Sequence, residues 1–360
     1  MTDLKVLLLS RYGRLGASSR VRSYQYLPYL REAGIDVTAA PLLADQYIER
    51  LYEGRRQDLV RIIAAYGRRL WQLATSFRFD LLWIEAELLP WVPAWLETLL
   101  VRLGVPYVVD YDDAVFHRYD LHASSWVRRV LGGKIDQVMR QARLVMVGSD
   151  YLADRARQAG AKRVEYLPTV IDATRYRASS NGAASVYTIG WIGSPLTASS
   201  LNLVRSALGE VCAHGNARVT LVGAGRFTLD SVPIDVRPWS EATEVAELQR
   251  FDVGIMPLPD GPWERGKCGY KAIQYMACAR PVVASPIGAN AHIVEHGRDG
   301  LLATTPADWV AALRTLQDAS LRTRMGASGR AKVERAYCIQ VTAPRVASVL
   351  RSAVQSDGGR

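Results

Sequence analysis

Apolar runs of strand length alternate with helical segments along the whole chain. The first half predicts strands at 6–9, 35–39, 81–84, 107–110, 144–148 and 164–166. The second half predicts strands at 188–192, 219–222, 234–236, 253–256 and 282–284. Strands separated by helices in this order indicate parallel, doubly wound α/β sheets. Because 360 residues exceed one typical core, we predict two Rossmann-like domains that face a cleft.

Helical segments fill the spaces between these strands. They are expected at 19–33, 45–77, 94–103, 126–141, 197–213, 241–250, 267–278, 289–296, 306–317 and 320–354. Residues 177–186, rich in small and polar side chains, form the clearest linker. We therefore place the first domain at 1–177 and the second at 187–335.

The composition is that of an ordinary globular protein with a positive net charge. The chain has 49% apolar and 22% charged residues and a net charge of +10, with a surplus in both halves. This surplus favours a polyanionic ligand or an anionic membrane surface, whereas no lysine-rich tail or repeated aromatic–basic module indicates nucleic acid. We recognise no signal peptide and no membrane-spanning run. The four cysteines form no CxxC pair, so we expect reduced thiols and a cytoplasmic protein.

A basic segment at 263–277 is the strongest indication of a binding site. A helix there places three polar side chains on one face, at i, i+4 and i+7: Lys267, Lys271 and Gln274. Arg265 lies just before them, where the free amides of a helix N-terminus favour an anion. We predict a phosphate or diphosphate site, and a solvated basic face is the alternative.

A loop that contains two glycines, Tyr12–Gly16, follows the first predicted strand. Open α/β sheets usually bind a ligand at this position, but the loop does not match the GxGxxG dinucleotide pattern. Arg20 and Arg22 follow near the start of a helix, where positive charge is unfavourable unless an anion or a carboxylate answers it. Gly16 and Arg20 are therefore candidates for ligand contact, and a loop without a functional role is the alternative.

Three acidic residues cluster at the end of one predicted strand: Asp110, Asp112 and Asp113. Carboxylates at such a place accept hydrogen bonds from sugar hydroxyls, bind a divalent cation or act as a base. His117 follows within reach of the same loop. We take Asp112, Asp113 and His117 as candidate catalytic residues, and capping of the next helix by one aspartate is the alternative.

The first strand-to-helix turn of the second domain runs from Gly193 to Thr197. Gly193 permits a ligand to approach the backbone closely, and the hydroxyls of Ser194 and Thr197 at a helix start suit a phosphate. A plain helix cap is the alternative. Asn290 opens a later helix whose N-terminal amides also suit a phosphate.

The segment 292–296 matches the H-x-x-E-H pattern of zinc peptidases. Its helix ends at once at Gly297, and no further acidic ligands accompany it. We therefore predict no metal site and no bound cofactor.

Several motifs together resemble those of glycosyltransferase family 4, a family of retaining enzymes with the GT-B fold. The motifs follow the order and spacing of that family: Leu167–Asp172, Asp252–Pro257, Tyr275–Ala277, Arg280–Ser285 and Glu295–Leu302. Each motif is loose by itself, and the ordered set is the more specific signal.

The resemblance implies a nucleotide-sugar donor held by the second domain and an acceptor held mainly by the first. It also implies that the segment 336–360 forms a helix that returns to the first domain. The expected acceptor is a polysaccharide, a glycolipid or a glycosylated metabolite that offers a hydroxyl, with Gly16 and Arg20 among its contacts. Retention of the sugar's configuration is expected.

The chain departs from the family at the usual pair of glutamates, which align with Gly266 and Gln274. The family's Arg and Lys after the second domain's first strand are replaced by Ser194 and Pro195. We therefore expect the donor diphosphate to contact three cations, which also remove the need for a metal ion: Arg265, Lys267 and Lys271. Gln274 would contact the ribose.

Two other functions stay open. An inactive sugar-nucleotide-binding protein is suggested by the missing glutamates, and a GT-B epimerase would convert a nucleotide sugar without an acceptor. The basic segment 45–78, with Trp71 and Phe77, further suggests peripheral association with an anionic membrane, whereas surface arginines on a solvated helix are the default explanation.

Overall fold

The computed structural model describes residues 4–178, 186–213, 215–230 and 232–355. Most of the predicted linker, 177–186, therefore lies outside the described residues. The fold divides into two compact units. Unit 1 contains the chain up to Thr169, the short stretch Arg265–Cys268, and the chain from Thr342 onward; unit 2 contains Val170–Glu264 and Gly269–Val341.

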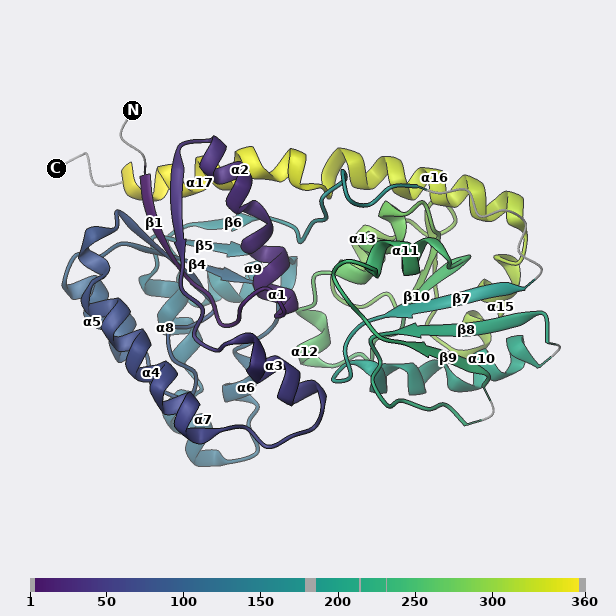
Figure 1. Ribbon diagram of the computed structural model, residues 1–360, viewed down its shortest axis with the longest axis horizontal. Coiled ribbons are helices and arrows are strands. Elements are labelled where there is room, and N and C mark those ends of the chain that lie inside the picture. Colours follow the sequence, from purple (N-terminus) through teal and green to yellow (C-terminus); the bar gives the residue numbers. More distant parts are fainter. Residues whose placement is uncertain (1–3, 179–185, 214, 231, 356–360) are drawn as a thin grey trace. The chain divides into compact units, whose positions relative to one another are not determined.

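Unit 1 is built on a six-stranded parallel sheet with the strand order β2-β1-β3-β4-β5-β6 (Figure 1). Its strands are β1 (Leu4–Leu9), β2 (Ile35–Ala39), β3 (Leu81–Glu85), β4 (Tyr107–Tyr111), β5 (Leu144–Val147) and β6 (Val164–Tyr166). Every residue of β3, β4 and β5 is buried, because helices cover both faces of a parallel sheet.

In Figure 1 the strands of unit 1 run between α2 and α17 on one side and α5 and α8 on the other. The helical elements of the first half are α1 (Ala17–Arg22), η1 (Tyr24–Tyr26), α2 (Leu27–Glu32), α3 (Asp45–Tyr52), α4 (Leu59–Ala74), η2 (Ser76–Arg78), α5 (Trp95–Arg102), α6 (His117–Asp120), α7 (Ser125–Leu131), α8 (Lys134–Gln141) and α9 (Asp150–Gln158). The last helix, α17 (Ile339–Gln355), also contributes most of its length to this unit.

Unit 2 repeats the design with a second six-stranded parallel sheet, in the order β12-β11-β10-β7-β8-β9. Its strands are β7 (Tyr187–Ile192), β8 (Ala217–Val222), β9 (Ile234–Arg237), β10 (Val253–Met256), β11 (Val282–Ala284) and β12 (Gly300–Leu302). In both sheets the order reverses beside the first strand, which creates a switch point between β1 and β3 and another between β7 and β10.

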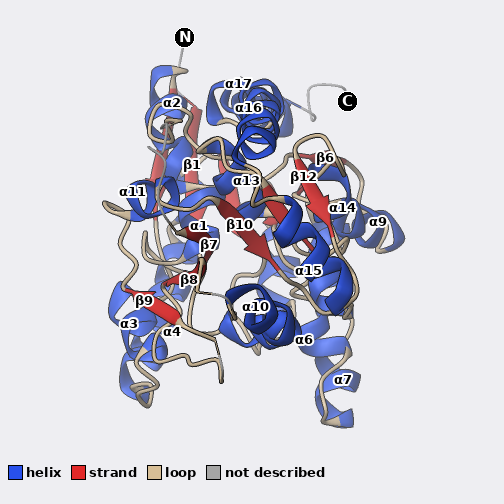
Figure 2. Cartoon of the chain, turned by 90° about the vertical axis from the view of Figure 1, so that its right-hand side faces the viewer, coloured by secondary structure: helices blue, strands red, loops and turns tan. Residues whose placement is uncertain are grey.

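In Figure 2, α13 and α10 lie on opposite sides of the unit 2 strands β7 and β10. The helical elements of the second half are η3 (Ala198–Val204), α10 (Arg205–Cys212), α11 (Glu244–Gln249), α12 (Pro262–Arg265), α13 (Tyr270–Ala277), α14 (Asn290–Ile293), α15 (Pro306–Thr315) and α16 (Ala319–Ala336). Helix α15 begins with a capping box, in which Thr305 and Asp308 exchange side-chain-to-backbone hydrogen bonds.

The predicted fold class, two doubly wound Rossmann-like domains, is confirmed by these two parallel sheets. All predicted strands are present, and β12 was not foreseen. The predicted helix at 19–33 is wrong as one element, because it breaks at Ser23 and restarts with Pro28 in the first turn of α2. The segment 45–77 is mainly helical as predicted, and it contains α3, α4 and the start of η2.

The predicted helix at 267–278 begins at Tyr270 instead. Gly269, which precedes it, has a φ of 70°, a left-handed conformation through which a helix does not continue. Lys267 therefore does not share a helical face with Lys271 and Gln274, and that expectation is wrong.

Within the described residues, no helix is both long enough and apolar enough to cross a membrane.

The centre of the unit 2 sheet depends on two glycines that pair across strands, Gly190 on β7 and Gly254 on β10. A Cβ atom on Gly190 would lie 2.0 Å from the Phe251 ring, and one on Gly254 would lie 2.2 Å from the Tyr275 ring. The two aromatic rings thus occupy the space that side chains would need. The packing of the core therefore requires glycine at both positions, whereas their backbone conformation does not.

Gly190→Ala should lower the free energy of unfolding by about 1–3 kcal/mol, because the added methyl group overpacks the core against Phe251. The matched control is Gly67→Ala in the exposed interior of α4, where nothing lies within 4 Å of the new Cβ. That change should raise stability by about 0.5–1 kcal/mol. Denaturant unfolding measures both, and equal effects of the same sign would contradict this account.

Candidate active site

The predicted catalytic residues of unit 1 lie where its central strands end. Asp112 and Asp113 follow β4, and Glu85 ends the neighbouring strand β3, opposite Asp110 in the β3–β4 register. Because the carboxyl ends of parallel strands share one edge of the sheet, side chains from distant parts of the sequence meet there.

A buried ion pair anchors this edge. Arg22 of α1 donates from Nη2 to Asp110 Oδ1 at 2.5 Å and from Nε to Asp110 Oδ2 at 3.0 Å. Its Nη1 donates to the carbonyl of Leu167 at 2.7 Å. Asp110 is thus the carboxylate that answers the charge of Arg22 near the helix start, and it serves a structural role.

Contacts within the loop Tyr12–Gly16 and with the helix that follows it stabilise the loop. A Cβ atom on Gly16 would lie 2.5 Å from Cβ of Tyr12, so the close approach of Tyr12 requires a glycine here. Arg20 is buried, and its Nη1 donates to the carbonyl of Arg14 at 3.0 Å. Gly16 and Arg20 therefore shape the loop, and their contact with an acceptor stays a prediction.

Asp112 and Asp113 are both half-buried. Burial, followed by the nearby charge of Asp113, raises the pKa of Asp112 to about 7, although a hydrogen bond from Ser18 acts in the opposite direction. The N-cap residue of α6, Phe116, has no side-chain cap hydrogen bond, so neither aspartate caps that helix. A carboxyl group with this pKa exchanges protons near neutral pH.

The short stretch Arg265–Cys268 belongs to unit 1, although its neighbours in sequence belong to unit 2. Lys267 Nζ donates to Asp113 Oδ1 at 3.2 Å. Gly266 is buried, and a Cβ atom there would lie 2.6 Å from Cβ of Ala114. This contact leaves no room for a glutamate at the position that the family resemblance aligned with one.

The other members of this stretch differ in exposure. The thiol of Cys268 is buried and donates to the carbonyl of Asp112 at 3.0 Å, whereas Arg265 is exposed at the end of α12. Burial raises the pKa of Cys268 well above its usual range, so this thiol is not a nucleophile.

His117 is held at both ring nitrogens. Nδ1 lies 2.8 Å from Asp120 Oδ1, and Nε2 lies 2.8 Å from the hydroxyl of Tyr151. Asp120 in turn pairs with Arg155 at 3.1 Å. With both nitrogens engaged in this way, His117 is part of a structural network, and a direct catalytic role stays a prediction.

In unit 2, the turn after β7 stands at the switch point of the sheet. The Thr197 hydroxyl donates to the carbonyl of Ser194 at 3.1 Å and lies 3.3 Å from its amide nitrogen. A Cβ atom on Gly193 would lie 2.3 Å from the Trp191 ring. The hydroxyl of Thr197 therefore stabilises the turn itself, and Gly193 brings the backbone close to the indole.

Three further residues of unit 2 carry the predicted donor contacts. Lys271 Nζ lies 5.3 Å from the centroid of the Trp191 ring, a cation–π contact. Gln274 is buried, and its Nε2 donates to the hydroxyl of Tyr176 at 2.8 Å. Asn290 is also buried, and its Oδ1 has no hydrogen-bond partner among the described residues.

The Gln274 contact belongs to a network that sequence reasoning missed. Tyr176 donates to Glu244 Oε1 at 2.8 Å, and the Trp239 indole donates to Glu244 Oε2 at 3.0 Å. Glu244 is buried, so this carboxylate organises the interior of unit 2. The sequence carries no spacing signal for it, since Tyr176 lies 68 residues before Glu244.

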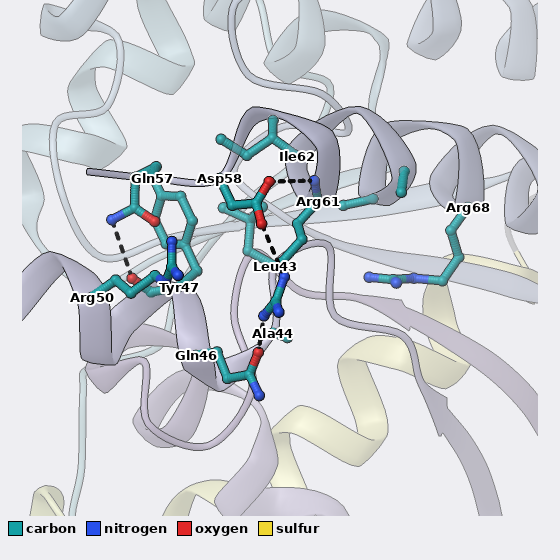
Figure 3. A pocket seen from close by; sticks show the side chains of 12 residues that line it. Leu43, Ala44, Gln46, Tyr47, Arg50, Gln57, Asp58, Arg61, Ile62 and Arg68 are labelled. Atoms are coloured by element: carbon teal, nitrogen blue, oxygen red, sulfur yellow. Dashed lines mark hydrogen bonds and ion pairs between the residues drawn. The ribbon is translucent and has the colours of Figure 1, made fainter. Parts of the chain in front are cut away.

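A cavity of about 220 Å³ opens between α3 and α4 in unit 1 (Figure 3). Three arginines line it beside apolar side chains: Arg50, Arg61 and Arg68. Arg61 pairs with Asp58 at 3.2 Å, and Arg68 donates to the carbonyl of Leu42 at 2.8 Å. The cavity contains none of the predicted site residues, but it lies within the basic segment 45–78.

No group of three or more His, Cys, Asp or Glu side chains that could hold a metal ion occurs in the described part of the chain. This includes the segment 292–296, whose helix α14 ends at Ile293.

Two parallel six-stranded sheets with flanking helices match the GT-B architecture of two-domain proteins. A family model described as "Glycosyl transferase 4-like domain" matches residues 6–169, and another described as "Glycosyl transferases group 1" matches residues 186–318. The chain belongs to the GT-B glycosyltransferases. Among curated proteins, no sequence match to it is found.

Solved structures agree with this fold at low sequence identity. Sucrose-phosphate synthase from Thermosynechococcus elongatus has a TM-score of 0.73 at 15% identity, over 98% of this chain and 100% of that one. Anabaena HepE in complex with UDP-glucose has a TM-score of 0.72 at 16% identity, over 97% and 100%. A glycosyltransferase from Rickettsia africae has a TM-score of 0.72 at 10% identity, over 99% and 100%.

Asp112→Asn tests the raised pKa of this carboxyl group. Because a folded-state pKa of about 7 exceeds the usual unfolded value of about 4, folded wild-type protein binds more protons than the unfolded chain between these values. Its free energy of unfolding therefore falls by about 2–4 kcal/mol as pH rises from about 4 to 7. The variant lacks this decline, so its stability relative to wild type should rise across that window and level off above it.

The measurement is denaturant unfolding at a series of pH values. Asp154→Asn, which removes an exposed carboxylate paired with Arg157, is the matched control. Parallel stability curves for wild type and Asp112→Asn would refute the raised pKa.

Proposed function

We propose that this protein transfers a sugar from a nucleoside-diphosphate sugar to a hydroxyl of an acceptor, with retention of configuration, as members of glycosyltransferase family 4 do. The observation that carries the proposal is the β7 switch-point turn of unit 2, which has Gly193 at its start and Lys271 beside it. Such a turn suits a diphosphate, because backbone amides and a cation both stabilise the leaving group.

The donor contacts in this proposal come from backbone groups and cations. Ser194 and Thr197 present the turn, Lys271 supplies positive charge, and the unpartnered Oδ1 of buried Asn290 suits a donor hydroxyl. Gln274, already bonded to Tyr176, would reach the ribose only by exchanging that bond. The bound form of HepE supports the choice of a nucleotide sugar.

Lys267 and Arg265 are the other two cations that the sequence suggests for the donor diphosphate. A bound diphosphate would compete with Asp113 for the Lys267 ammonium. Donor binding would therefore release the Asp113 carboxylate from its ion pair. Since lysine and arginine neutralise the developing negative charge, this mechanism needs no metal ion.

The acceptor hydroxyl in this proposal is positioned beside Asp112 and Asp113. A carboxyl group with a pKa of about 7 is well matched to accept a proton near neutral pH. His117 would act through its contact with Tyr151, and Gly16 and Arg20 would shape the acceptor side of the loop. The acceptor itself is a polysaccharide, a glycolipid or a glycosylated metabolite.

Two rival functions are separated by product analysis. A sugar-nucleotide-binding protein without activity would bind the donor and release no nucleoside diphosphate. An epimerase would convert the donor without any acceptor. Ala114 fills the space beside Gly266, so a glutamate does not fit there. This observation favours the first rival function, a sugar-nucleotide-binding protein without activity.

The donor assignment is tested by thermal shift with UDP-, GDP-, ADP-, CDP- and dTDP-sugars. One of these should raise the apparent melting temperature of wild type, because a ligand that binds only the folded state stabilises it. Lys271→Ala and Lys267→Ala should weaken binding at least about tenfold each, since each charge-assisted contact contributes roughly 1.5–3 kcal/mol. Lys162→Ala, at an exposed position in unit 1, is the control. Full binding in both variants would refute the assignment.

We also propose that the protein works in the cytoplasm and associates peripherally with anionic membranes through α4 and η2. Six large apolar side chains of these elements are exposed: Leu59, Val60, Ile63, Leu70, Trp71 and Phe77. The arginine-lined cavity beside α4 suits the phosphate of a lipid headgroup (Figure 3). Apolar insertion together with headgroup attraction is the combination that interfacial helices use.

Co-sedimentation with vesicles tests this proposal. Wild type should bind vesicles that contain phosphatidylglycerol at low salt and bind neutral vesicles weakly, while Ile63→Ser combined with Trp71→Ser should reduce binding several-fold. Trp95→Ser, at an equally exposed tryptophan on α5, is the matched control. If wild type stays in the supernatant with anionic vesicles, the membrane proposal fails.

A further inference from the structure

A single buried carboxylate at the edge of the unit 1 sheet holds three cations. Glu87 Oε1 lies 3.2 Å from Arg118 Nη1 and 3.7 Å from Arg11 Nη1. Glu87 Oε2 accepts from Lys134 Nζ at 2.5 Å and from the hydroxyl of Tyr119 at 2.7 Å. One negative charge thus faces three positive charges in a place where water is largely excluded.

Other carboxylates do not remove the surplus. Glu85 is an electrostatic neighbour of both Arg11 and Arg69, and Glu97 is one of Lys134. Together with Glu87, three carboxylates thus face four cations: Arg11, Arg69, Arg118 and Lys134. The cluster therefore keeps at least one uncompensated positive charge.

The two arginines of this cluster reach the surface. Their side chains are 18% and 24% exposed for Arg11 and Arg118, whereas Glu87 and Lys134 are buried. The contact with Glu87 fixes both guanidinium groups without covering them. Two fixed, accessible guanidinium groups suit a carboxylate or phosphate group better than mobile surface arginines, because less side-chain freedom is lost on binding.

The cluster stands at the switch point of the unit 1 sheet. Arg11 follows β1, Glu87 follows β3, and Arg118 lies on α6, soon after β4. In open α/β sheets, ligands bind beyond the carboxyl ends of the strands at the point where the strand order reverses. The surplus charge therefore lies where a ligand is expected.

An exposed indole packs against Tyr119, the residue whose hydroxyl donates to Glu87. Trp91 is 51% exposed, and its ring centroid lies 5.4 Å from that of Tyr119 and 5.7 Å from that of His122. Its backbone N–H donates to the Tyr119 hydroxyl at 3.1 Å, the same hydroxyl that donates to Glu87. Two hydrogen bonds thus connect the Trp91 backbone, through the Tyr119 hydroxyl, to the carboxylate that holds the arginines.

The loop that carries Glu87 and Trp91 is held in an unfavourable backbone conformation. Ala86 has a φ of 60° and Trp91 a φ of 63°, values that side-chain-bearing residues rarely adopt. Tyr66 holds the loop by donating to the carbonyl of Pro90 at 2.8 Å. Such strain is characteristic of segments that present groups to a ligand.

We propose that this cluster is an acceptor subsite and that the acceptor is an anionic carbohydrate. Arg11 and Arg118 bind its carboxylate or phosphate group, and a sugar ring packs against the indole of Trp91. The inference rests on the proposed transfer function and adds the chemical class of its acceptor.

The test is isothermal titration of the full-length protein with three probes at low salt: glucuronate, glucose 1-phosphate and glucose. At least one charged probe should bind, and neutral glucose at the same concentration should not. Binding of glucuronate alone identifies a carboxylate subsite, and binding of glucose 1-phosphate alone identifies a phosphate subsite. Raising the salt concentration should weaken the binding. Equal binding of glucose, or no binding of either charged probe, overturns the proposal.

Variants locate the binding. Arg11→Gln and Arg118→Gln should each weaken it at least tenfold, Trp91→Asn should weaken it several-fold, and Arg102→Gln, at an exposed position on α5, should leave it unchanged. Asparagine is chosen at 91 because it tolerates a positive φ. If a glutamine variant does not fold, Arg118→Lys, which keeps the charge but not the two-pronged geometry, replaces it and should weaken binding less. Unchanged affinity in both arginine variants overturns the proposal.

Lys271→Ala separates this inference from the donor assignment. It should lose the thermal shift with nucleotide sugars and keep the affinity for the charged probe. If instead Lys271→Ala abolishes probe binding and the arginine variants keep it, the probe occupies the donor site and the subsite proposal is wrong. If no nucleotide sugar raises the melting temperature of wild type, the proposed donor is wrong. Binding of the charged probe would not be affected by that result.

Discussion

The ion pair between Arg22 and Asp110 is the interaction on which the edge of the unit 1 sheet depends. Two charges taken out of water cost several kcal/mol each, and the cost is offset only when geometry and further hydrogen bonds are good. Here the carboxylate receives two charge-assisted bonds, and the guanidinium also donates to the Leu167 carbonyl. The pair ties α1 to β4 and to the end of β6. Because Asp112 and Asp113 directly follow β4, the ion pair also fixes the backbone from which these two residues project.

The fold was predictable because each parallel strand is short, apolar and bounded by helices. Runs such as Leu81–Glu85 and Tyr107–Tyr111 are buried on both faces, and burial of this kind leaves a clear trace in the sequence. The helix boundaries were less predictable, because single residues decide them. Gly269, in a left-handed conformation, delays the start of α13, and the strand Gly300–Leu302 is too short to stand out.

The candidate site was predictable only in part. The local signals, glycines and polar residues directly after strands, single out positions such as Gly16, Asp112 and Gly193, whose contacts with ligands stay predictions. Contacts between residues that are far apart in the sequence leave no recognisable pattern in it. Lys267 meets Asp113 across 154 residues, and the role of Glu87 depends on cations from three elements. Gln274 differs from these residues. Its position in the predicted helix suggested contact with a ligand, but its amide donates a hydrogen bond to Tyr176 within unit 2.

The interruption of unit 2 by the stretch Arg265–Cys268 has a consequence for how these enzymes can be recombined. Unit 1 is assembled from three separate pieces of chain, and Cys268 is part of its hydrophobic core. A fragment cut after the first domain would therefore lack part of its own interior, and a chimera with a foreign second half would bring in a mismatched insert against Ala114. Evolution by exchange of whole halves is thus constrained: the few residues before α13 must be inherited with the N-terminal half that they complete.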